Sequence, residues 1–258
     1  MGRNAMNASD LFWVDLVPYI YQQPHLNAKQ DIDQITNLLS LAPQSRILDV
    51  ACGIGRHALE CAQKGFFVTA YDINSSLIDE NQRKSRDRNL DIEWLQANMT
   101  EFCRPESYDA IINLFFSFGY SEHPETDQQV LKKCYQSLRP GGKLVMQLMG
   151  RELIEKWFQP KYWSLEQDGA FVLVEKQLNY EKALLHETVY VLKDNDKKKY
   201  QMTTRIHYAS QISELLQNTG FKQLQIFGGL SGTSYNENAS SLVIVGQKPL
   251  KINAMIRC

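Results

Sequence analysis

Short apolar runs alternate with amphipathic stretches through the middle of the chain. Runs at 47–50, 66–71, 92–95, 108–116 and 143–149 have the length of strands, and helix-spaced apolar residues lie between them. Strands that alternate with helices predict a doubly wound α/β fold with a mostly parallel sheet. The run at 108–116 is apolar almost throughout, so we expect a central strand that is buried on both faces.

The pattern changes after Gly150. Runs at 171–179, 184–192 and 200–208 each predict a strand, and no helix pattern separates them. Strands this close in sequence pair antiparallel, and Asp194-Asn195-Asp196 predicts a polar turn between two of them. We therefore predict an antiparallel β-meander inserted into the α/β fold.

The two ends of the chain complete the predicted organisation. Runs at 221–227 and 241–246 predict a closing strand pair at the edge of the main sheet, which brings that sheet to seven strands. Helix-spaced apolar residues also precede the first strand. We expect four parts, namely an N-terminal helical lid at 1–45, a ligand-binding core at 46–150, an inserted substrate cap at 151–208 and the end of the core at 209–258.

Composition and charge exclude several classes of protein. The 258 residues carry 28 basic and 29 acidic side chains, a net charge of −1, and 43% are hydrophobic. These values are typical of a globular domain and offer no basic surface for nucleic acid. Apolar runs are shorter than the roughly 20 residues that cross a membrane, and the polar start lacks a signal core. Five cysteines without a C-x-x-C pair fit neither a zinc ribbon nor a disulfide framework, so we expect a cytoplasmic protein without a metal site.

The segment Asp49-Val50-Ala51-Cys52-Gly53-Ile54-Gly55 carries the clearest chemistry. It predicts a strand, a glycine turn and the start of a helix, where unpaired backbone N–H groups face a ligand. Asp72 ends the next predicted strand, and an acid at that place accepts hydrogen bonds from ribose hydroxyls. Together these features predict a nucleoside-binding crevice at the carboxyl ends of the strands.

Two cofactors compete for this crevice. The run from Gly53 to Ala58 fits G-x-G-x-x-A, the dinucleotide fingerprint. Asp49 argues against a dinucleotide, because its carboxylate would repel a pyrophosphate. S-adenosylmethionine carries a sulfonium, an ammonium and no phosphate, so the charge pattern favours it.

The combination of motifs resembles the class I S-adenosylmethionine-dependent methyltransferases. The resemblance runs from Ile47–Gly55 through Asp72 and Gln96-Ala97-Asn98-Met99 to Leu138-Arg139-Pro140-Gly141-Gly142, and returns in the closing 208–246 stretch. It implies a Rossmann-like core, S-adenosylmethionine as cofactor and S-adenosylhomocysteine as product. The antiparallel insertion is similar to that of the small-molecule members, which implies a nitrogen or oxygen of a small molecule as acceptor.

The resemblance also implies roles for individual residues. Asp49 matches the acid that helps place the methionine end of the cofactor, and Asp72 matches the ribose acid. Asn98 stands where the family has an aspartate that bonds the adenine amino group, and we expect its carbonyl to keep that role. A glycine is usual at the position of Ala51, where we expect the backbone to avoid positive φ. The remaining cofactor positions are Cys52, Gly53, Gly55, Ile73, Met99, Leu114 and Phe115.

The acceptor side carries no comparable motif. The loop after the fourth strand offers Tyr120 and His123 as candidate bases, and the meander offers His207. The fourth predicted strand ends in Asn113-Leu114-Phe115-Phe116. This run differs from the Asn-Pro-Pro-Tyr signature of enzymes that methylate flipped bases. Two other functions stay open, a non-catalytic S-adenosylmethionine-binding protein and an NAD-type oxidoreductase. An exposed face of the meander also leaves a homodimer possible.

Overall fold

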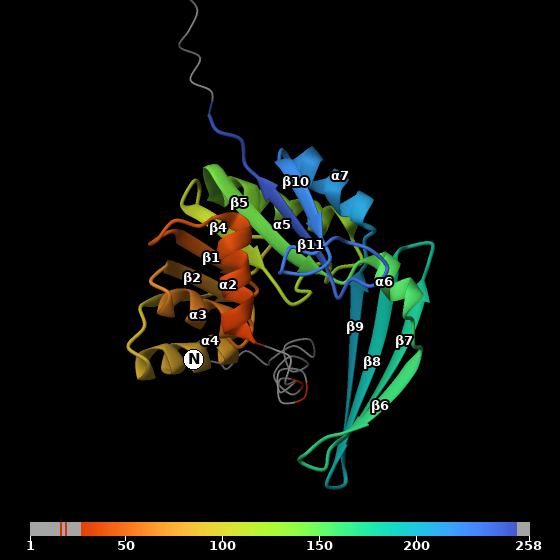
Figure 1. Ribbon diagram of the computed structural model, residues 1–258. Helices are drawn as coiled ribbons and strands as arrows, with labels where there is room; N and C mark the ends of the chain where they lie inside the picture. Colours follow the sequence, from red (N-terminus) through yellow and green to blue (C-terminus); the bar gives the residue numbers. More distant parts are fainter. Residues whose placement is uncertain (1–15, 17–18, 20–26, 252–258) are drawn as a thin grey trace, which may run out of the picture.

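The computed structural model describes residues 16, 19 and 27–251, which form two sheets (Figure 1). The larger sheet has seven strands in the order β10-β11-β5-β4-β1-β2-β3. Its strands are β1 Arg46–Val50, β2 Phe67–Asp72, β3 Ile92–Gln96, β4 Tyr108–Asn113, β5 Leu138–Leu148, β10 Lys222–Phe227 and β11 Leu242–Gln247. The first five are parallel, and β11 runs antiparallel between β5 and β10. The predicted seven-stranded, mostly parallel sheet is confirmed.

Helices cover both faces of this sheet because successive strand residues point to opposite sides. On β4, Ala110 and Ile112 pack toward one helix layer and Ile111 toward the other. One layer contains α2 Ala28–Leu39, α3 Arg56–Gln63 and α4 Ser75–Asp87, and the other contains α5 Pro124–Ser137 and α7 Ala209–Thr219. Both faces of the central strands are therefore buried, as the apolar run at 108–116 predicts.

A second sheet projects from the core as a curved antiparallel cap (Figure 1). It follows the short helix α6 Arg151–Lys156 and contains β6 Lys161–Leu165, β7 Phe171–Asn179, β8 Leu184–Lys193 and β9 Asp196–Arg205. The meander thus has four strands, one more than predicted. The turn between β8 and β9 is confirmed: Asp194 and Asn195 have φ of 48° and 68°, which suit a tight hairpin.

Two helix ends have defined caps. Helix α2 ends at Leu39, with Ser40 in the left-handed conformation. Helix α7 has Tyr208 as its N-cap, where Tyr208 and Gln211 form a capping box. Most of the predicted lid at 1–45 lies outside the described residues, apart from Leu16, Tyr19 and the segment from 27. No helix in the described part of the chain is long and apolar enough to cross a membrane.

Candidate functional site

The turn between β1 and α3 is held by hydrogen bonds from two neighbouring elements. The Cys52 N–H donates to the carbonyl of Tyr71 over 2.9 Å, and the Gly53 N–H donates to Asp72 Oδ2 over 2.9 Å. From helix α4, the Asn81 amide donates to the carbonyl of Gly53 over 2.8 Å. The turn is therefore fixed against the ends of β1 and β2, at the carboxyl edge of the sheet where α/β proteins bind ligands.

Backbone conformation explains why small residues form this turn. Gly53 and Gly55 have φ of 54° and 74°, and a Cβ on Gly55 would lie 2.6 Å from a ring carbon of Trp94. Ala51 has φ of 56°, so the expectation that it would avoid positive φ is wrong. Left-handed backbone costs an alanine about 1–2 kcal/mol, which the surrounding hydrogen bonds must offset.

Asp49 has a buried carboxyl group, one oxygen of which accepts no hydrogen bond from the described residues. Its side chain lies at the end of β1 with 2% exposure, and Oδ2 has no hydrogen-bond partner among the described residues. Burial raises the pKa of Asp49 to about 8, opposed by the charge of Arg56 and reinforced by that of Asp72. An uncompensated buried carboxylate favours a ligand that brings a positive charge.

The end of β2 pairs a carboxylate with an exposed apolar side chain. Asp72 accepts from Gly53 with one oxygen and from the Asn74 N–H with the other, over 3.0 Å. Ile73 is 52% exposed beside it. A carboxylate next to an uncovered apolar surface suits a ribose followed by a flat base.

The side-chain carbonyl of Asn98 already accepts two hydrogen bonds from Thr100. Its Oδ1 accepts from the Thr100 N–H over 3.0 Å and from the Thr100 hydroxyl over 2.9 Å. Since a carbonyl oxygen has two lone pairs, both acceptor positions are already used. Asn98 lies beside the predicted nucleoside site, since the neighbouring Ala97 N–H bonds to the carbonyl of Asp72 over 3.0 Å.

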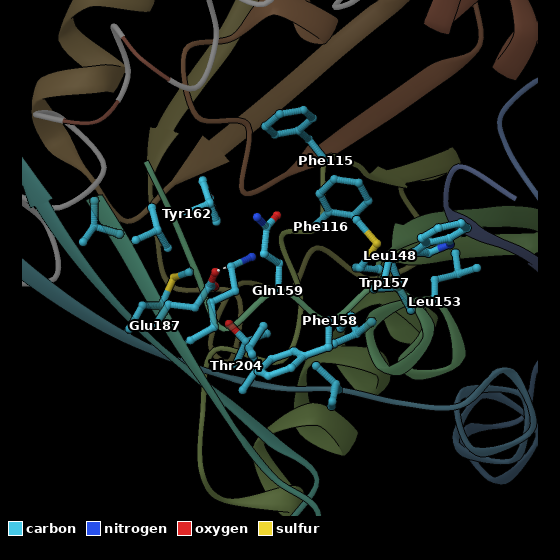
Figure 2. A pocket seen from close by; sticks show the side chains of 18 of the residues that line it. Phe115, Phe116, Leu148, Leu153, Trp157, Phe158, Gln159, Tyr162, Glu187 and Thr204 are labelled. Atoms are coloured by element: carbon cyan, nitrogen blue, oxygen red, sulfur yellow. Dashed lines mark ion pairs between the residues drawn. The ribbon is translucent and has the colours of Figure 1, made fainter. Parts of the chain in front are cut away.

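The other predicted cofactor positions separate into buried and cavity-facing residues. Leu114 and Cys52 are buried in the core, and Met99 packs against the hydrophobic cluster on the opposite face of the sheet. Burial raises the pKa of the Cys52 thiol, which removes it as a nucleophile. Phe115 points into a cavity between the core and the cap (Figure 2).

That cavity has a volume of about 720 Å³ and lies between the core, helix α6 and the inner face of the cap. Figure 2 shows Phe115 and Phe116 on its core side, and Trp157 and Leu153 from the α6 region on another. Most of its wall is apolar or aromatic, with a few polar groups, as in small-molecule sites. The size and lining suit an organic molecule with a largely apolar body.

Two of the three predicted bases lie at this cavity. His207 and Tyr120 line it, and the Tyr120 hydroxyl donates to the carbonyl of Phe116 over 3.1 Å. His123 lies at the start of α5 with a 76% exposed side chain, 3.7 Å from Glu125, and is not among the lining residues. The structure therefore leaves His123 outside the site, because it caps a helix instead of following the loop inward.

His207 is held by an acid that sequence analysis missed. Its Nε2 lies 2.9 Å from Asp127 Oδ2, and Asp127 is buried in the first turn of α5 with 2% exposure. The Arg205 guanidinium lies 3.8 Å from the same oxygen, and the Phe118 ring centroid lies 5.9 Å from that of His207. Asp127 escaped detection because an acid in the first turn of a helix is ordinarily a solvent-exposed favourable charge. Within the described residues, no three His, Cys, Asp or Glu side chains gather to hold a metal.

Comparisons with known proteins agree on one family. The methyltransferase domain family matches residues 47–142. A putative methyltransferase of Geobacillus sp. (strain WCH70) is 25% identical over 209 residues, 79% of this chain and 84% of that protein. A ubiquinone biosynthesis O-methyltransferase of Rickettsia canadensis is 31% identical over 120 residues, 46% of this chain and 49% of that protein.

The fold has a similar counterpart among solved structures. An S-adenosylmethionine-dependent methyltransferase from Clostridium acetobutylicum superposes with a TM-score of 0.78, covering 94% of this chain and 100% of that one at 15% identity. A superposition over 94% of the chain extends beyond residues 47–142 and includes most of the cap.

Proposed function

This chain is a class I S-adenosylmethionine-dependent methyltransferase, and on that premise we propose that it methylates an oxygen atom of a small molecule bound between core and cap. One observation carries the choice of oxygen: a histidine oriented by a buried carboxylate stands on the cavity wall. The O-methyltransferase named among the relatives supports the same choice.

The residues at the carboxyl ends of β1 and β2 fit the cofactor. S-adenosylmethionine supplies a methyl group on a positively charged sulfur. Asp49, whose Oδ2 lacks a partner in the described chain, would hold its cationic methionine end. Asp72 would accept from the ribose, and Ile73 would cover a face of the adenine. Gly55, where a Cβ would strike Trp94, keeps the turn closely packed at this site.

The pair of His207 and Asp127 has the arrangement of an oriented general base. If Asp127 accepts a hydrogen bond from Nε2–H, the Nδ1 lone pair of the neutral imidazole is available to a substrate hydroxyl. A hydroxyl is a poor nucleophile until its proton is removed, whereas a neutral amine attacks through its free lone pair. An oriented base therefore matters more for an oxygen acceptor than for a nitrogen acceptor.

The core side of the cavity is built to exclude water. Phe115, Phe116 and Phe118 all line it, and Phe118 also packs near the His207 ring. A dry, aromatic wall orients the acceptor and prevents water from competing for the base.

The test measures transfer of a labelled methyl group to two sets of probes of equal shape, hydroxybenzamides and aminobenzamides. We expect the hydroxyl set to be methylated and His207→Ala to lower kcat by about 10²–10⁴-fold, with S-adenosylhomocysteine binding unchanged. Asp127→Asn should shift the pH profile while leaving KM nearly unaltered. His186→Ala is the matched control, since His186 bonds to Thr203 outside the cavity lining.

The other outcomes each contradict the proposal. Methylation of the amines alone would replace oxygen with nitrogen as the acceptor atom. Binding of S-adenosylhomocysteine without transfer to either set would favour a non-catalytic binding protein. Binding of NADH in its place would favour an oxidoreductase.

A further inference from the structure

We propose that Lys176 and Glu187 form a polar subsite on the inner face of the cap that selects an uncharged, hydroxylated acceptor with an apolar body. The inference rests on the proposed O-methylation for the identity of the cavity as the acceptor site. It goes further by naming the chemical class of the acceptor and the residues that choose it.

The two side chains face each other across neighbouring strands. Lys176 of β7 and Glu187 of β8 are register partners, and Lys176 Nζ lies 3.1 Å from Glu187 Oε1. Their side chains are 26% and 16% exposed, and both line the cavity, where Figure 2 marks their ion pair. The inner-face neighbours Val174, Val189 and Leu185 are buried and apolar. Lys176 and Glu187 therefore form a charged pair surrounded by apolar side chains of the cap.

Folding stability does not account for a charge pair in this place. Taking two charges out of water costs about as much as their attraction returns, so apolar residues of similar size would serve the sheet equally well. The cap also has an equivalent pair on strands β6 and β7, where Lys161 lies 2.8 Å from Glu175. The Lys161 side chain is 69% exposed, and neither residue lines the cavity. The inner pair differs from it chiefly in facing the space that a substrate would occupy.

The unused donors and acceptors of the pair specify the complementary group. Lys176 has three N–H donors and gives one to Glu187, while the Tyr162 ring lies 5.3 Å from Nζ. Glu187 meets Lys176 through Oε1, and a carboxylate has a second oxygen, Oε2, that can also accept. A hydroxyl can accept from Lys176 and donate to Glu187 at the same time, which a carboxylate or an ammonium cannot do.

The charge balance of the cavity excludes an ionised acceptor. Its described lining residues include two fixed cations, Lys176 and Arg205, and two carboxylates, Glu166 and Glu187. A charged ligand would leave one charge uncompensated in an apolar enclosure, which is costly. An uncharged ligand keeps the balance.

The test is calorimetric titration of the full chain saturated with S-adenosylhomocysteine, using three catechols that differ in charge. The probes are 3,4-dihydroxybenzamide, which is neutral, 3,4-dihydroxybenzoate, an anion, and dopamine, a cation. We expect the neutral probe to bind at least tenfold more tightly than either ion.

Each single substitution should replace the preference for the neutral probe by a preference for one of the two ions. Glu187→Gln leaves Lys176 unpaired and should make the anion the tightest ligand. Lys176→Met leaves Glu187 unpaired and should favour the cation. Glu175→Gln, on the outer pair, should leave the ranking of the probes unchanged. The double variant Lys176→Met/Glu187→Leu should unfold at an unchanged urea concentration while losing the preference for the neutral probe.

Three results would overturn the subsite: a ranking unaltered by both single variants, an ionic probe preferred by the unmodified chain, or no binding of any probe. Because binding is measured without turnover, failure of O-methylation is seen separately. Charge selectivity without methyl transfer to the hydroxyl would refute the proposed reaction and retain the subsite.

Discussion

The turn that follows β1 and the cavity under the cap are built by different means. The turn is one contiguous segment, 49–55, whose backbone groups are bonded to the end of β2 and to Asn81 in the middle of α4. The cavity is assembled from side chains of α6, the loop after β4 and alternate positions of the cap strands. A site made from backbone tolerates few residues and leaves a motif, whereas a site made from side chains can change without disturbing its strands. Cofactor binding should therefore be fragile to small changes and acceptor choice should be adjustable.

The largest expected effect is a loss of folding stability, and it compares one glycine in the turn with one in the cap. Gly55 in the turn and Gly169 in the cap have φ of 74° and 82°, so alanine costs each about 1–2 kcal/mol in backbone strain. A Cβ on Gly55 would also strike Trp94 and Asn81, whereas nothing lies within 4 Å of a Cβ on Gly169. We expect urea unfolding to show a loss of about 3 kcal/mol for Gly55→Ala and about 1 kcal/mol for Gly169→Ala. Equal losses would show that packing at the turn is not tight.

Removing the acid at the end of β2 should have the next largest effect. Asp72→Ala deletes the acceptor of the Gly53 and Asn74 N–H groups as well as the ribose contact we assign to it. We expect S-adenosylhomocysteine to bind about a hundredfold more weakly by calorimetry, which is about 2.7 kcal/mol. Asp79→Ala, at an exposed position of α4, is the control and should bind normally. Undiminished binding in Asp72→Ala would refute the assigned cofactor site.

The raised pKa of Asp49, about 8, predicts a pH dependence of cofactor binding. A cationic ligand requires the ionised carboxylate, so binding must release the proton that Asp49 holds below that pH. We expect affinity for S-adenosylhomocysteine to rise up to tenfold per pH unit towards pH 8 and to level off above it. Calorimetry at pH 7 in buffers of different ionisation enthalpy should show release of about one proton.

Stability should show the opposite trend without ligand. Because the folded-state pKa of Asp49 lies above its unfolded value of 3.8, this group stabilises the unliganded protein most below pH 4. That contribution is lost as the pH rises through about 8. Asp49→Asn is the control for both measurements and should abolish proton release. Proton release that survives in Asp49→Asn would assign it to another group.

The smallest expected effect is a gain in affinity for S-adenosylhomocysteine when Asn98 is replaced by aspartate. Aspartate there could keep one oxygen on Thr100 and offer the other to the adenine amino group. We expect Asn98→Asp to tighten S-adenosylhomocysteine binding by about threefold to tenfold, within the range of one charge-assisted hydrogen bond. Asn89→Asp adds the same charge at an exposed position and should have no effect. Weaker binding in Asn98→Asp would mean that the amide N–H is the group that contacts the ligand.

Local sequence patterns were sufficient to predict the fold of the core and insufficient to predict all strands of the cap. The seven-stranded, mostly parallel sheet and the turn at 49–55 follow from apolar runs, glycines and the acids that end β1 and β2. Strand β6 was missed because its five residues are mostly exposed, with Trp163 at 65% exposure. Ala51 was misjudged because the hydrogen bonds that impose its φ come from Tyr71 and Asp72, which lie outside the motif.

The acceptor site depends on contacts that no window of sequence contains. His207 was a candidate, but its partner Asp127 is separated from it by 80 residues. On the cofactor side, by contrast, the Asn98 carbonyl is held by a local contact with Thr100, two residues further on. His123 has the right residue type and loop, and only the start of α5 shows that it faces solvent. Residue type indicated the chemistry in each case, and contacts in the folded chain, local for Asn98 and distant in sequence for His207, decided which way the side chain faces.

The cap leaves and rejoins the core at one point, since the Arg151 N–H donates to the carbonyl of His207 over 2.9 Å. A segment whose two ends are bonded together can be exchanged for another of different length with little strain on the host. Residues 152–206 are thus a natural cassette for transplanting acceptor pockets between enzymes of this kind. A graft with its joints at 151 and 207 would import a new substrate preference and retain both His207 and the core residue Asp127. The base we propose would therefore stay with the recipient protein and not with the insert.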